Sequence, residues 1–457
     1  MRPLPSSYRD NDGFVFEHHG TIYRFIHSQF QPQYGHLMTS GLYNELTSKN
    51  WLVAHEEIPD ASAWGFTDGQ VILPQQIPFI SYPYEWSFTM WKDAALLTLK
   101  IAVAALQNKL LLKDATPFNI QFLNGKPVFI DTLSFEFYQE GNPWIAYRQF
   151  CENFLAPLLL MHYCHHDSYK FFTIYPNGIP LDVLTSLLPK KSLWNLNVYL
   201  HIHLHAKLTG KQKKGTSTKA HFSKQKLEVL LAGLTNFVSK LTLKKTKTTW
   251  DDYYTDTILG KDYLNTKKAL VQSFLSEIDF TKVIDLGAND GYFSLLFKNT
   301  TKQLIAVDGD ANCINELYLK IRREKITNIL PLINTLNTPS PAIGWNNAER
   351  DSFNKRIKGD LVMALALVHH LAISCNVPLQ LIADWLEPMG KYLLIEFVPK
   401  TDEKVKLLLQ NREDIFHNYT VENFEQIFSK KFQLVSQKKI AGTDRILYLM
   451  KKINETT

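Results

Sequence analysis

The stretch TKVIDLGANDGYFSLLF, residues 281–297, restricts the fold of this chain more than any other stretch does. An apolar strand ends at Ile284, and Asp285 opens a tight turn. Gly287 and Gly291 complete this turn, after which an apolar helical pattern resumes. A dinucleotide-binding turn would instead read GxGxxG, because its glycines let pyrophosphate approach a helix N-terminus. The sequence therefore predicts an α/β sheet whose first turn differs from that of a dinucleotide-binding fold.

Later segments place polar residues at further strand ends. QLIAVDGDAN is an apolar strand that ends in Asp308, at the spacing where an acidic side chain binds ribose hydroxyls. In GDLVMALALVHHL, Asp360 enters a strand, and His369 and His370 follow its end. GKYLLIEFVPK is another buried strand and carries Glu396. Because ligands bind outside the carboxyl ends of strands in open α/β sheets, we expect one site at this edge.

The order of these motifs resembles that of class I S-adenosylmethionine-dependent methyltransferases, in which a D-x-G-x-x-x-G turn passes beside the methionine part of the cofactor. The resemblance implies S-adenosylmethionine as cofactor and a Rossmann-like C-terminal sheet that ends in the antiparallel pair FQLVSQKKI and RILYLMKK. Asn289 stands where the family commonly has a glycine, and Asn visits the left-handed region more readily than most residues. The cofactor-binding residues so implied are Asp285, Gly287, Ala288, Asn289, Gly291, Asp308 and Asp360.

Three segments narrow the resemblance to a bacterial group of methyltransferases related to the nodulation protein NoeA, and it extends over nearly the whole chain. These segments are YPYEWS (82–87), NTPSPAIGWNNAER (337–350) and DLVMALALVHHLAISCNVPL (360–379). One departure is local. Where an acidic residue is expected after the third strand, this chain has Asn334 and Thr335, which leaves the adenine contact open.

Methyl transfer from a sulfonium releases a neutral thioether, so positioning carries most of the catalysis. A hydroxyl or amine acceptor also needs a base, and a histidine at a strand end suits this task. We expect His370 to be the base, with His369 as the next candidate and Glu396 as an alternative base or acceptor ligand. Capping of the following helix is the alternative role of the two histidines. Candidates for a lid over the acceptor, or for packing, are Trp345, Glu349 and Arg350.

The first half contains LLKDATPFNIQFLNGKPVFIDTLSF, residues 111–135. Its Asp114, Asn119 and Asp131 have the spacing of a phosphotransferase catalytic loop, in which the first Asp accepts the substrate proton and the others bind magnesium. The pattern resembles kinase-like enzymes of the aminoglycoside phosphotransferase type and implies ATP with magnesium as a second ligand. A short turn, LNGKP, predicts the hairpin that places Asp131.

The partners of such a loop are less evident. Residues 13–26 contain no GxGxxG, and no V-A-I-K lysine occurs. Arg24 is the stand-in for that lysine and Glu45 for its ion-pair partner, although arginine differs from lysine in reach and geometry. We therefore weigh three interpretations of the first half: a degenerate kinase-like scaffold that positions the acceptor, which we favour, an active phosphotransferase, and coincidence.

The length of 457 residues predicts more than one domain. We expect a kinase-like α+β domain over 1–206, a basic linker or helical connection over 207–247, and the methyltransferase domain over 248–457. The net charge of +6 is concentrated in the lysines of the middle segment, a composition that fits nucleic acid, an anionic membrane or a solvated linker. No aromatic residues interleave with these lysines to stack bases, which favours the linker.

The four cysteines have no paired spacing, so the sequence predicts neither a disulfide framework nor a zinc knuckle. Without a leader-like or membrane-spanning stretch, we expect a cytoplasmic protein. No metal site is expected either, because few acidic or cysteine ligands accompany the clustered histidines. These histidines are His162, His165, His166, His201, His203 and His205.

Taken together, the sequence predicts a two-domain methyltransferase that acts on an oxygen or nitrogen of a small molecule, a glycan or a lipid head group. Nucleic acid is not expected as its substrate. Two alternatives stay open: a bifunctional kinase and methyltransferase that modifies a glycan or small molecule, and a non-catalytic binding module on a methyltransferase scaffold. The acceptor and the oligomeric state cannot be read from the sequence.

Overall fold

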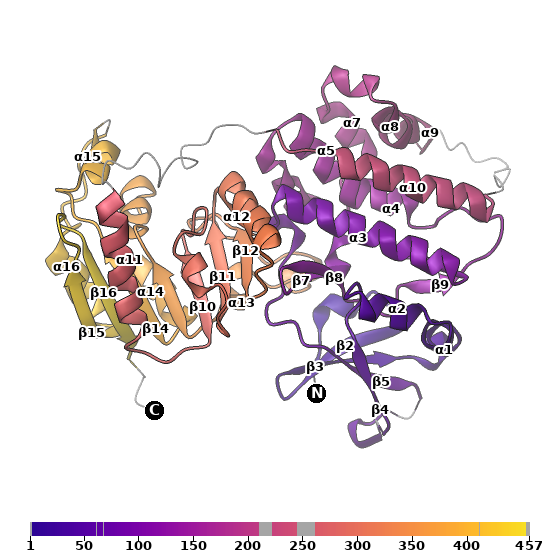
Figure 1. Ribbon diagram of the computed structural model, residues 1–457, viewed down its shortest axis with the longest axis horizontal. Helices are drawn as coiled ribbons and strands as arrows, with labels where there is room; N and C mark the ends of the chain where they lie inside the picture. The colour runs from indigo at the N-terminus through magenta and orange to yellow at the C-terminus, as the bar shows by residue number, and fades with distance from the viewer. Residues whose placement is uncertain are drawn as a thin grey trace. The chain divides into compact units, whose positions relative to one another are not determined.

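The chain folds into two compact units (Figure 1). The first comprises Met1–Thr246 and Pro341–Asp351, and the second comprises Lys247–Ser340 and Ser352–Thr457. The predicted fold class is confirmed, since a mixed α+β unit precedes a unit with a mostly parallel, seven-stranded sheet. The computed structural model describes residues 2–60, 62–66, 68–209, 222–244, 261–410 and 412–453.

A five-stranded antiparallel sheet begins the first unit. Its spatial order is β1 (Arg2–Pro3), β2 (Gly13–His18), β3 (Thr21–Ile26), β5 (Gln70–Pro74) and β4 (His55–Ile58). Helices α1 (Gln31–Thr39) and α2 (Leu42–Ser48) lie between β3 and β4 in the chain. Neighbouring residues of β3 point to opposite faces of the sheet, so that Phe25 and Ile26 belong to different core clusters.

The kinase-like loop lies between short hairpins that follow the long helix α3 (Phe88–Gln107). Strands β7 (Ile120–Leu123) and β8 (Lys126–Phe129) form the predicted hairpin, and β6 (Leu110–Leu112) pairs with β9 (Phe135–Phe137). Asn124 and Gly125 both have positive φ, 53° and 73°, as a two-residue hairpin turn requires. The sequence LNGKP therefore sets the turn that brings Asp131 back toward Asn119.

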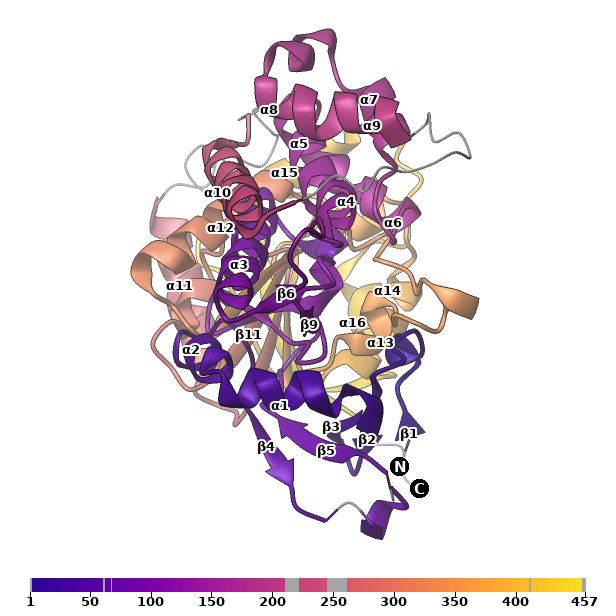
Figure 2. The same cartoon turned by 90° about the vertical axis from the view of Figure 1, so that its right-hand side faces the viewer.

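The rest of the first unit is helical (Figure 2). The helices are α4 (Tyr147–Phe150), α5 (Ala156–Tyr163), α6 (Phe171–Ile174), α7 (Leu181–Leu187), α8 (Leu196–Val198), α9 (His205–Thr209) and α10 (Lys224–Lys240). Helix α10 packs along α3 and buries Leu227, Leu231 and Leu234. Because this apolar stripe has helical spacing, the expected linker over 207–247 is in part a helix of the first unit. The lysines at 211, 213, 214, 219, 245 and 247 lie outside the described residues.

The sheet of the second unit has the order β12-β11-β10-β13-β14-β16-β15. The first five of these strands run parallel, and β16 lies antiparallel between β14 and β15, as the resemblance to class I methyltransferases implies. The strands are β10 (Lys282–Leu286), β11 (Gln303–Asp308), β12 (Ile329–Ile333), β13 (Leu361–Ala364), β14 (Tyr392–Phe397), β15 (Phe432–Lys439) and β16 (Ile446–Lys452).

Helices flank this sheet and bury its apolar strands. They are α11 (Lys261–Leu275), α12 (Ala311–Glu324), α13 (Phe353–Arg356), α14 (Leu379–Leu386), α15 (Glu403–Leu409) and α16 (Val421–Phe428). The helix-like approach expected from residue 248 is described from Lys261 onward, and residues 248–260 lie outside the described part of the chain. After the glycine turn, the chain forms only a short 3-10 helix, Ser294–Phe297, where the apolar pattern predicts a longer one.

Candidate active site

The carboxyl edge of the second sheet is where the fold can bind a ligand. The chain moves from β10 outward to β11 and β12, and then crosses to β13 on the other side of β10. Such a switch point leaves a crevice outside the carboxyl ends of the two central strands. The glycine turn follows β10 and the histidine pair follows β13, so the fold brings these two motifs to the same edge.

The turn after β10 depends on two glycines for different reasons. Gly287 has a φ of +77°, and a β-carbon there would meet only Leu367 at 3.5 Å. At Gly291, with φ +83°, a β-carbon would lie 2.5 Å from Leu317 Cδ1 on α12. Gly287 thus gives the turn its left-handed backbone, whereas Gly291 also lets the turn pack against the next helix. Asn289 takes a φ of +51°, which Asn tolerates, and Ala288 is buried.

Asp285 shapes the turn from inside. Its carboxylate is buried and accepts a hydrogen bond of 2.6 Å from Ser294 Oγ. Burial raises the pKa of Asp285 to about 6, aided by the charge of Asp308 and opposed by the Ser294 hydrogen bond. The Asp285 side chain therefore holds the strand and the turn together. It would act on a bound cofactor indirectly, by fixing the backbone of the turn.

Asp308, the last residue of β11, reaches the same turn. Its two oxygens accept hydrogen bonds of 2.8 Å from the backbone N–H of Asn289 and of Asp310. Burial raises the pKa of Asp308, and these hydrogen bonds oppose the rise. A carboxylate offers about four acceptor positions, so this one retains capacity for a diol. The rigidly held, half-buried carboxylate fits the ribose of an adenosyl cofactor.

The residues after β12 hold the neighbouring loop. Asn334 is buried, and its Nδ2 donates to Ser340 Oγ at 3.0 Å. Its backbone N–H donates to Asp308 O at 2.8 Å. Asn334 therefore joins β11 to the loop that follows β12, and its amide serves as both donor and acceptor to Ser340.

His369 and His370 lie in a helical turn that begins just after β13, with their rings 4.1 Å apart. His369 is fully buried, and neither of its ring nitrogens has a hydrogen-bond partner among the described residues. Burial lowers the pKa of His369 well below its usual value, and the nearby His370 and Arg445 act in the same direction. Burial also lowers the pKa of His370 to about 4. Both imidazoles are therefore neutral at pH 7, with a lone pair that can take a proton, but a lowered pKa makes each a weaker base than an ordinary histidine.

Glu396 lies near the end of β14 in a buried network of charges. Its Oε2 lies 2.5 Å from Lys267 Nζ, and its Oε1 accepts a 3.1 Å hydrogen bond from Tyr263 OH. Arg445 Nη1 lies 3.5 Å from the same carboxylate, and Arg445 also forms a two-point pair with Asp402 at 2.7 and 3.0 Å. Sequence reasoning missed these partners, because α11 and the residue before β16 lie far from Glu396 in the chain.

This network limits the chemistry of Glu396. Burial alone would raise the pKa of Glu396, but Lys267 and Arg445 outweigh it and lower the pKa. A carboxylate held ionised by two cations is a weak base at neutral pH. The lowered pKa is shared with the histidines and does not separate the candidates, but the ion pairs occupy both oxygens of Glu396, so this side chain is better placed to fix the shape of this edge.

Asp360 is at the wrong edge for its predicted role in cofactor binding. It precedes β13, and its Oδ2 accepts hydrogen bonds from Thr281 N (2.8 Å), Thr281 Oγ1 (2.7 Å) and Lys282 N (2.9 Å). Burial would raise the pKa of Asp360, but these hydrogen bonds lower it. The carboxylate thus joins the amino ends of β10 and β13, at the edge opposite the glycine turn. Asp360 therefore stands at the start of β13 because it pairs this strand with β10, and not because it contacts the cofactor.

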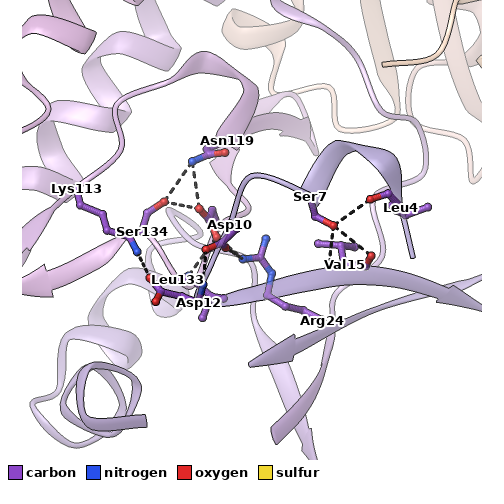
Figure 3. A network of polar contacts seen from close by, with 11 residues as sticks. Leu4, Ser7, Asp10, Asp12, Val15, Arg24, Lys113, Asn119, Leu133 and Ser134 are labelled. Carbon is purple, nitrogen blue, oxygen red and sulfur yellow. Dashed lines mark hydrogen bonds and ion pairs between the residues drawn. The ribbon is translucent and has the colours of Figure 1, made fainter. Parts of the chain in front are cut away.

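The kinase-like residues form a second cluster, in the first unit (Figure 3). Asp131 is bound by Arg24 and Ser134 through short contacts, by Leu133 N at 3.1 Å and by Asn119 Nδ2 at 3.2 Å. Burial would raise the pKa of Asp131, but Arg24 and Ser134 bring it below its ordinary value. The carboxylate that would bind magnesium in a kinase therefore already has a cationic partner from β3.

Acidic side chains occupy the loop between β1 and β2, where kinases place a glycine-rich loop over the phosphates. Ser7 fixes this loop: its hydroxyl donates to Leu4 O at 3.0 Å and accepts from Val15 N at 3.0 Å (Figure 3). Asp10 lies 3.9 Å from Arg24, and Asp12 contacts Lys113. Two carboxylates would repel a triphosphate from this position.

One other prediction for this cluster is corrected. Glu45 pairs with Lys49 at 2.7 Å, so it is not the ion-pair partner of Arg24. Asp114 lies beside the cluster, and burial together with the Asp131 charge raises its pKa. Asp114, Asn119 and Asp131 are thus brought together as predicted, but Arg24 satisfies the charge that a metal would otherwise satisfy.

Residues 341–351 belong to the first unit, although the chain on both sides belongs to the second. Glu349 pairs with Arg9 at 3.1 Å and with Arg350 at 3.1 Å. The Arg350 guanidinium lies 3.6 Å from the ring centre of Phe118, next to Asn119. Of the expected lid residues, Arg350 therefore packs on the kinase-like loop, Glu349 is buried between two arginines, and Trp345 is exposed.

Several of the clustered histidines have partners within the first unit. His203 Nε2 lies 3.0 Å from Ser192 Oγ, and His201 Nδ1 lies 2.8 Å from Tyr147 OH. His165, His166 and Asp167 bring ligand atoms within 4.8 Å of one another, but Lys170 Nζ lies 3.1 Å from the Asp167 carboxylate. An ammonium group thus already neutralises the acidic member of this group.

Comparison with known proteins adds the family context. No protein-family profile matches the chain. The chain is 32% identical to Nodulation protein NoeA from Rhizobium meliloti (strain 1021). The 461 aligned residues cover 98% of this chain and 96% of that protein. Among solved structures, the chain is similar to the N-methyltransferase NodS from Bradyrhizobium japonicum WM9 in complex with S-adenosyl-L-homocysteine. The identity is 13% and the TM-score is 0.34, and the match covers 45% of this chain and 93% of that chain. The chain is also similar to the bifunctional kinase-methyltransferase WbdD. The identity is 13% and the TM-score is 0.30, and the match covers 47% of this chain and 45% of that chain.

Proposed function

Because the chain belongs to the NoeA family of nodulation proteins, we propose that its second unit transfers a methyl group from S-adenosylmethionine to an oxygen or nitrogen of an acceptor. The observation that carries this proposal is the position of the Asp308 carboxylate, which accepts the Asn289 N–H of the glycine turn at 2.8 Å. A diol-binding carboxylate and a turn with left-handed backbone at Gly287 meet at one switch point. Together they suit the ribose and the methionine part of the cofactor.

The chain has three tasks in this reaction. The cofactor, when bound, supplies an electrophilic methyl group on a sulfonium whose leaving group is a neutral thioether. Residues 285–291 and Asp308 hold the cofactor, and the acceptor must be oriented in line with its methyl group. An acceptor proton passes to a neutral imidazole, for which His370 is favoured, since part of its side chain is exposed whereas His369 is fully buried. His369, beside Lys267 and Arg445, positions this turn.

The first unit acts in this proposal as a scaffold that helps to select the acceptor. The pairing of Arg24 with Asp131 and the acidic β1–β2 loop argue against the bifunctional alternative with ATP and magnesium. The acceptor class in the proposal is a small molecule, a glycan or a lipid head group. A cytoplasmic location belongs to the same proposal, since free cysteines such as Cys151 and Cys313 suit a reducing compartment.

The experiment uses S-adenosylmethionine with a radioactive methyl group and separate small-molecule, glycan and lipid fractions of a bacterial extract. We expect label in one fraction, at least a hundred-fold slower transfer by His370→Ala, and unchanged affinity of that variant for S-adenosylhomocysteine. His417→Ala, which changes an exposed histidine of the same unit, is the matched control.

Each outcome separates the alternatives. Full transfer activity of His370→Ala would move the base elsewhere. S-adenosylhomocysteine binding without label transfer to any fraction would favour the non-catalytic binding module. Release of labelled phosphate from ATP by the wild type, abolished in Asp131→Ala, would restore the bifunctional interpretation.

A further inference from the structure

The helical region that follows α7 exposes large apolar side chains at a density unusual for a protein surface. Trp194 is 91% exposed, Leu196 is 68% exposed and Leu208 is 61% exposed. The neighbouring exposed apolar residues are Leu187, Leu193 and Leu200. Figures 1 and 2 both show α7, α8 and α9 together at one end of the first unit, beyond α5. Exposed apolar residues gathered on neighbouring elements in this way indicate a site of interaction.

These residues lie on three neighbouring elements that pack against one another: Leu187 ends α7, Leu193 and Trp194 end the 3-10 helix Lys190–Trp194, and the others lie on the helical segment that follows. The chain is helical from Leu196 to Thr209, through a π-helical stretch over residues 199–204. Val198 and Ile202 face the interior and are fully buried, whereas Leu196 and Leu200, four residues apart, are both exposed. A surface helix ordinarily presents polar residues to solvent. Here Leu196, Leu200 and Leu208 take exposed positions beside Lys207, so the outer face is in part apolar.

The charged residues of the stretch 190–208, which carries most of this face, are all lysines. Lys190, Lys191 and Lys207 are exposed beside the apolar residues. In the sequence, no Asp or Glu occurs between Asp182 and Glu228. The same stretch contains lysines at positions 190, 191, 207, 211, 213, 214, 219, 224 and 226. A partner of this face must therefore combine an apolar layer with negative charge.

We propose that the face formed by Leu187, Lys190, Lys191, Leu193, Trp194, Leu196, Leu200, Lys207 and Leu208 docks on a bilayer that contains anionic lipids. Leucines and tryptophan enter the boundary between head groups and acyl chains, while lysines remain at the level of the anionic head groups. Nucleic acid fits less well, because single-strand binding relies on rings for stacking and most of these apolar residues are aliphatic.

The docking is peripheral. Over the described ranges, no helix combines the length and apolar content needed to cross a bilayer. Binding by short apolar side chains and lysines is reversible, and its strength depends on lipid charge and on salt. This inference is independent of the methyltransferase proposal, since it involves neither the cofactor nor the carboxyl edge of the second sheet.

Vesicle flotation of the full chain tests the inference. The probes are vesicles of phosphatidylcholine alone and vesicles with one third phosphatidylglycerol, each at low and high salt. We expect flotation only with phosphatidylglycerol, and at least a ten-fold weaker partition for Trp194→Ser combined with Leu196→Ser. Each of Lys190→Gln and Lys191→Gln should weaken the partition about five-fold. The matched control is Trp345→Ser, which removes another exposed tryptophan of the same unit and should leave flotation unchanged.

Three results would overturn the inference. They are the absence of flotation with phosphatidylglycerol vesicles, equal flotation of the Trp194/Leu196 variant and the wild type, and equal loss in Trp345→Ser. Sedimentation velocity and binding to single-stranded DNA are measured on the same proteins. A dimer or a DNA complex that disappears in the Trp194/Leu196 variant, without vesicle binding, would assign the face to a second copy or to nucleic acid instead. Thermal unfolding of each variant, with a midpoint like that of the wild type, shows that the substitutions leave the fold intact.

Discussion

Asp285 is predicted to make the second unit less stable as pH rises. Burial raises its pKa from 3.8 to about 6, so between these values the folded protein binds more protons than the unfolded chain does. Stability therefore falls as pH rises through this window. At 1.36 kcal/mol per pKa unit, the whole shift corresponds to about 3 kcal/mol, of which about 2.5 kcal/mol falls between pH 4 and pH 7.5.

Asp285→Asn removes this titration and retains an oxygen for the Ser294 hydroxyl. The free energy of unfolding of the variant, minus that of the wild type, should rise by about 2.5 kcal/mol between pH 4 and pH 7.5. This rise does not depend on the value of the difference at pH 4. Amide hydrogen exchange of peptides from β10 and β11, compared at equal pH, reports the second unit alone. The ratio of protection factors, variant to wild type, should rise about 60-fold over this range.

Asp360→Asn is the matched control, at the opposite edge of the same sheet. The folded-state pKa of Asp360 is lowered by its Thr281 and Lys282 hydrogen bonds, despite burial. Its stabilising contribution is therefore present above its unfolded pKa and is lost as pH falls, so the variant should lose stability relative to the wild type as pH rises. A protection ratio for Asp285→Asn that stays constant between pH 4 and pH 7.5 would show that burial does not raise the Asp285 pKa, and the reasoning would fail.

Three further substitutions test the buried pairs and the turn. Arg24→Ala should lower the stability of the first unit by about 3 kcal/mol, because Asp131 loses its cation, and Arg24→Lys should restore part of it; an unchanged melting temperature would contradict this. Lys267→Met should destabilise the second unit by about 3–5 kcal/mol in urea unfolding, because it leaves Glu396 buried without its cation. Adding Glu396→Gln should recover much of this loss, whereas additive losses would mean that the two side chains do not pair. Gly291→Ala should cost about 2 kcal/mol and weaken S-adenosylhomocysteine binding in calorimetry, because its β-carbon meets α12; a neutral effect would show that the turn can move.

The sequence was most informative where the signal is local. The D-x-G-x-x-x-G turn and Asp308 are each set by a strand end and the few residues after it, and the structure brings both to the switch point. The LNGKP hairpin is likewise a short-range feature, fixed by two residues with positive φ. Such features depend on backbone sterics and apolar periodicity, which a single sequence displays.

The sequence was less informative about contacts between distant elements. In the sequence, Glu396 looks like an unpaired acid at the end of a strand. In the structure, Lys267 from α11 and Arg445, the residue before β16, neutralise its charge. Arg24 reads as a substitute for a kinase lysine, yet its position in β3 pairs it with Asp131. Ion pairs of this kind depend on how the elements pack, so residue spacing does not reveal them.

One error concerns a strand start. Asp360 lies one residue before β13, where strand entry and ligand contact look alike in the sequence until the direction of the strand is known. The segment 207–247, predicted as a basic linker or a helical connection, contains the helix α10, which carries lysines and other polar residues beside its buried leucines.

The most direct test of the account is calorimetric titration of the full chain with S-adenosylhomocysteine, for the wild type, Asp308→Asn and Asp360→Asn. The account predicts binding by the wild type, at least ten-fold weaker binding by Asp308→Asn, because hydrogen bonds to a charged group are lost, and unchanged affinity for Asp360→Asn. A wild type that does not bind, or equal affinities for the wild type and Asp308→Asn, would contradict the assignment of the cofactor site to the carboxyl edge of β10 and β11.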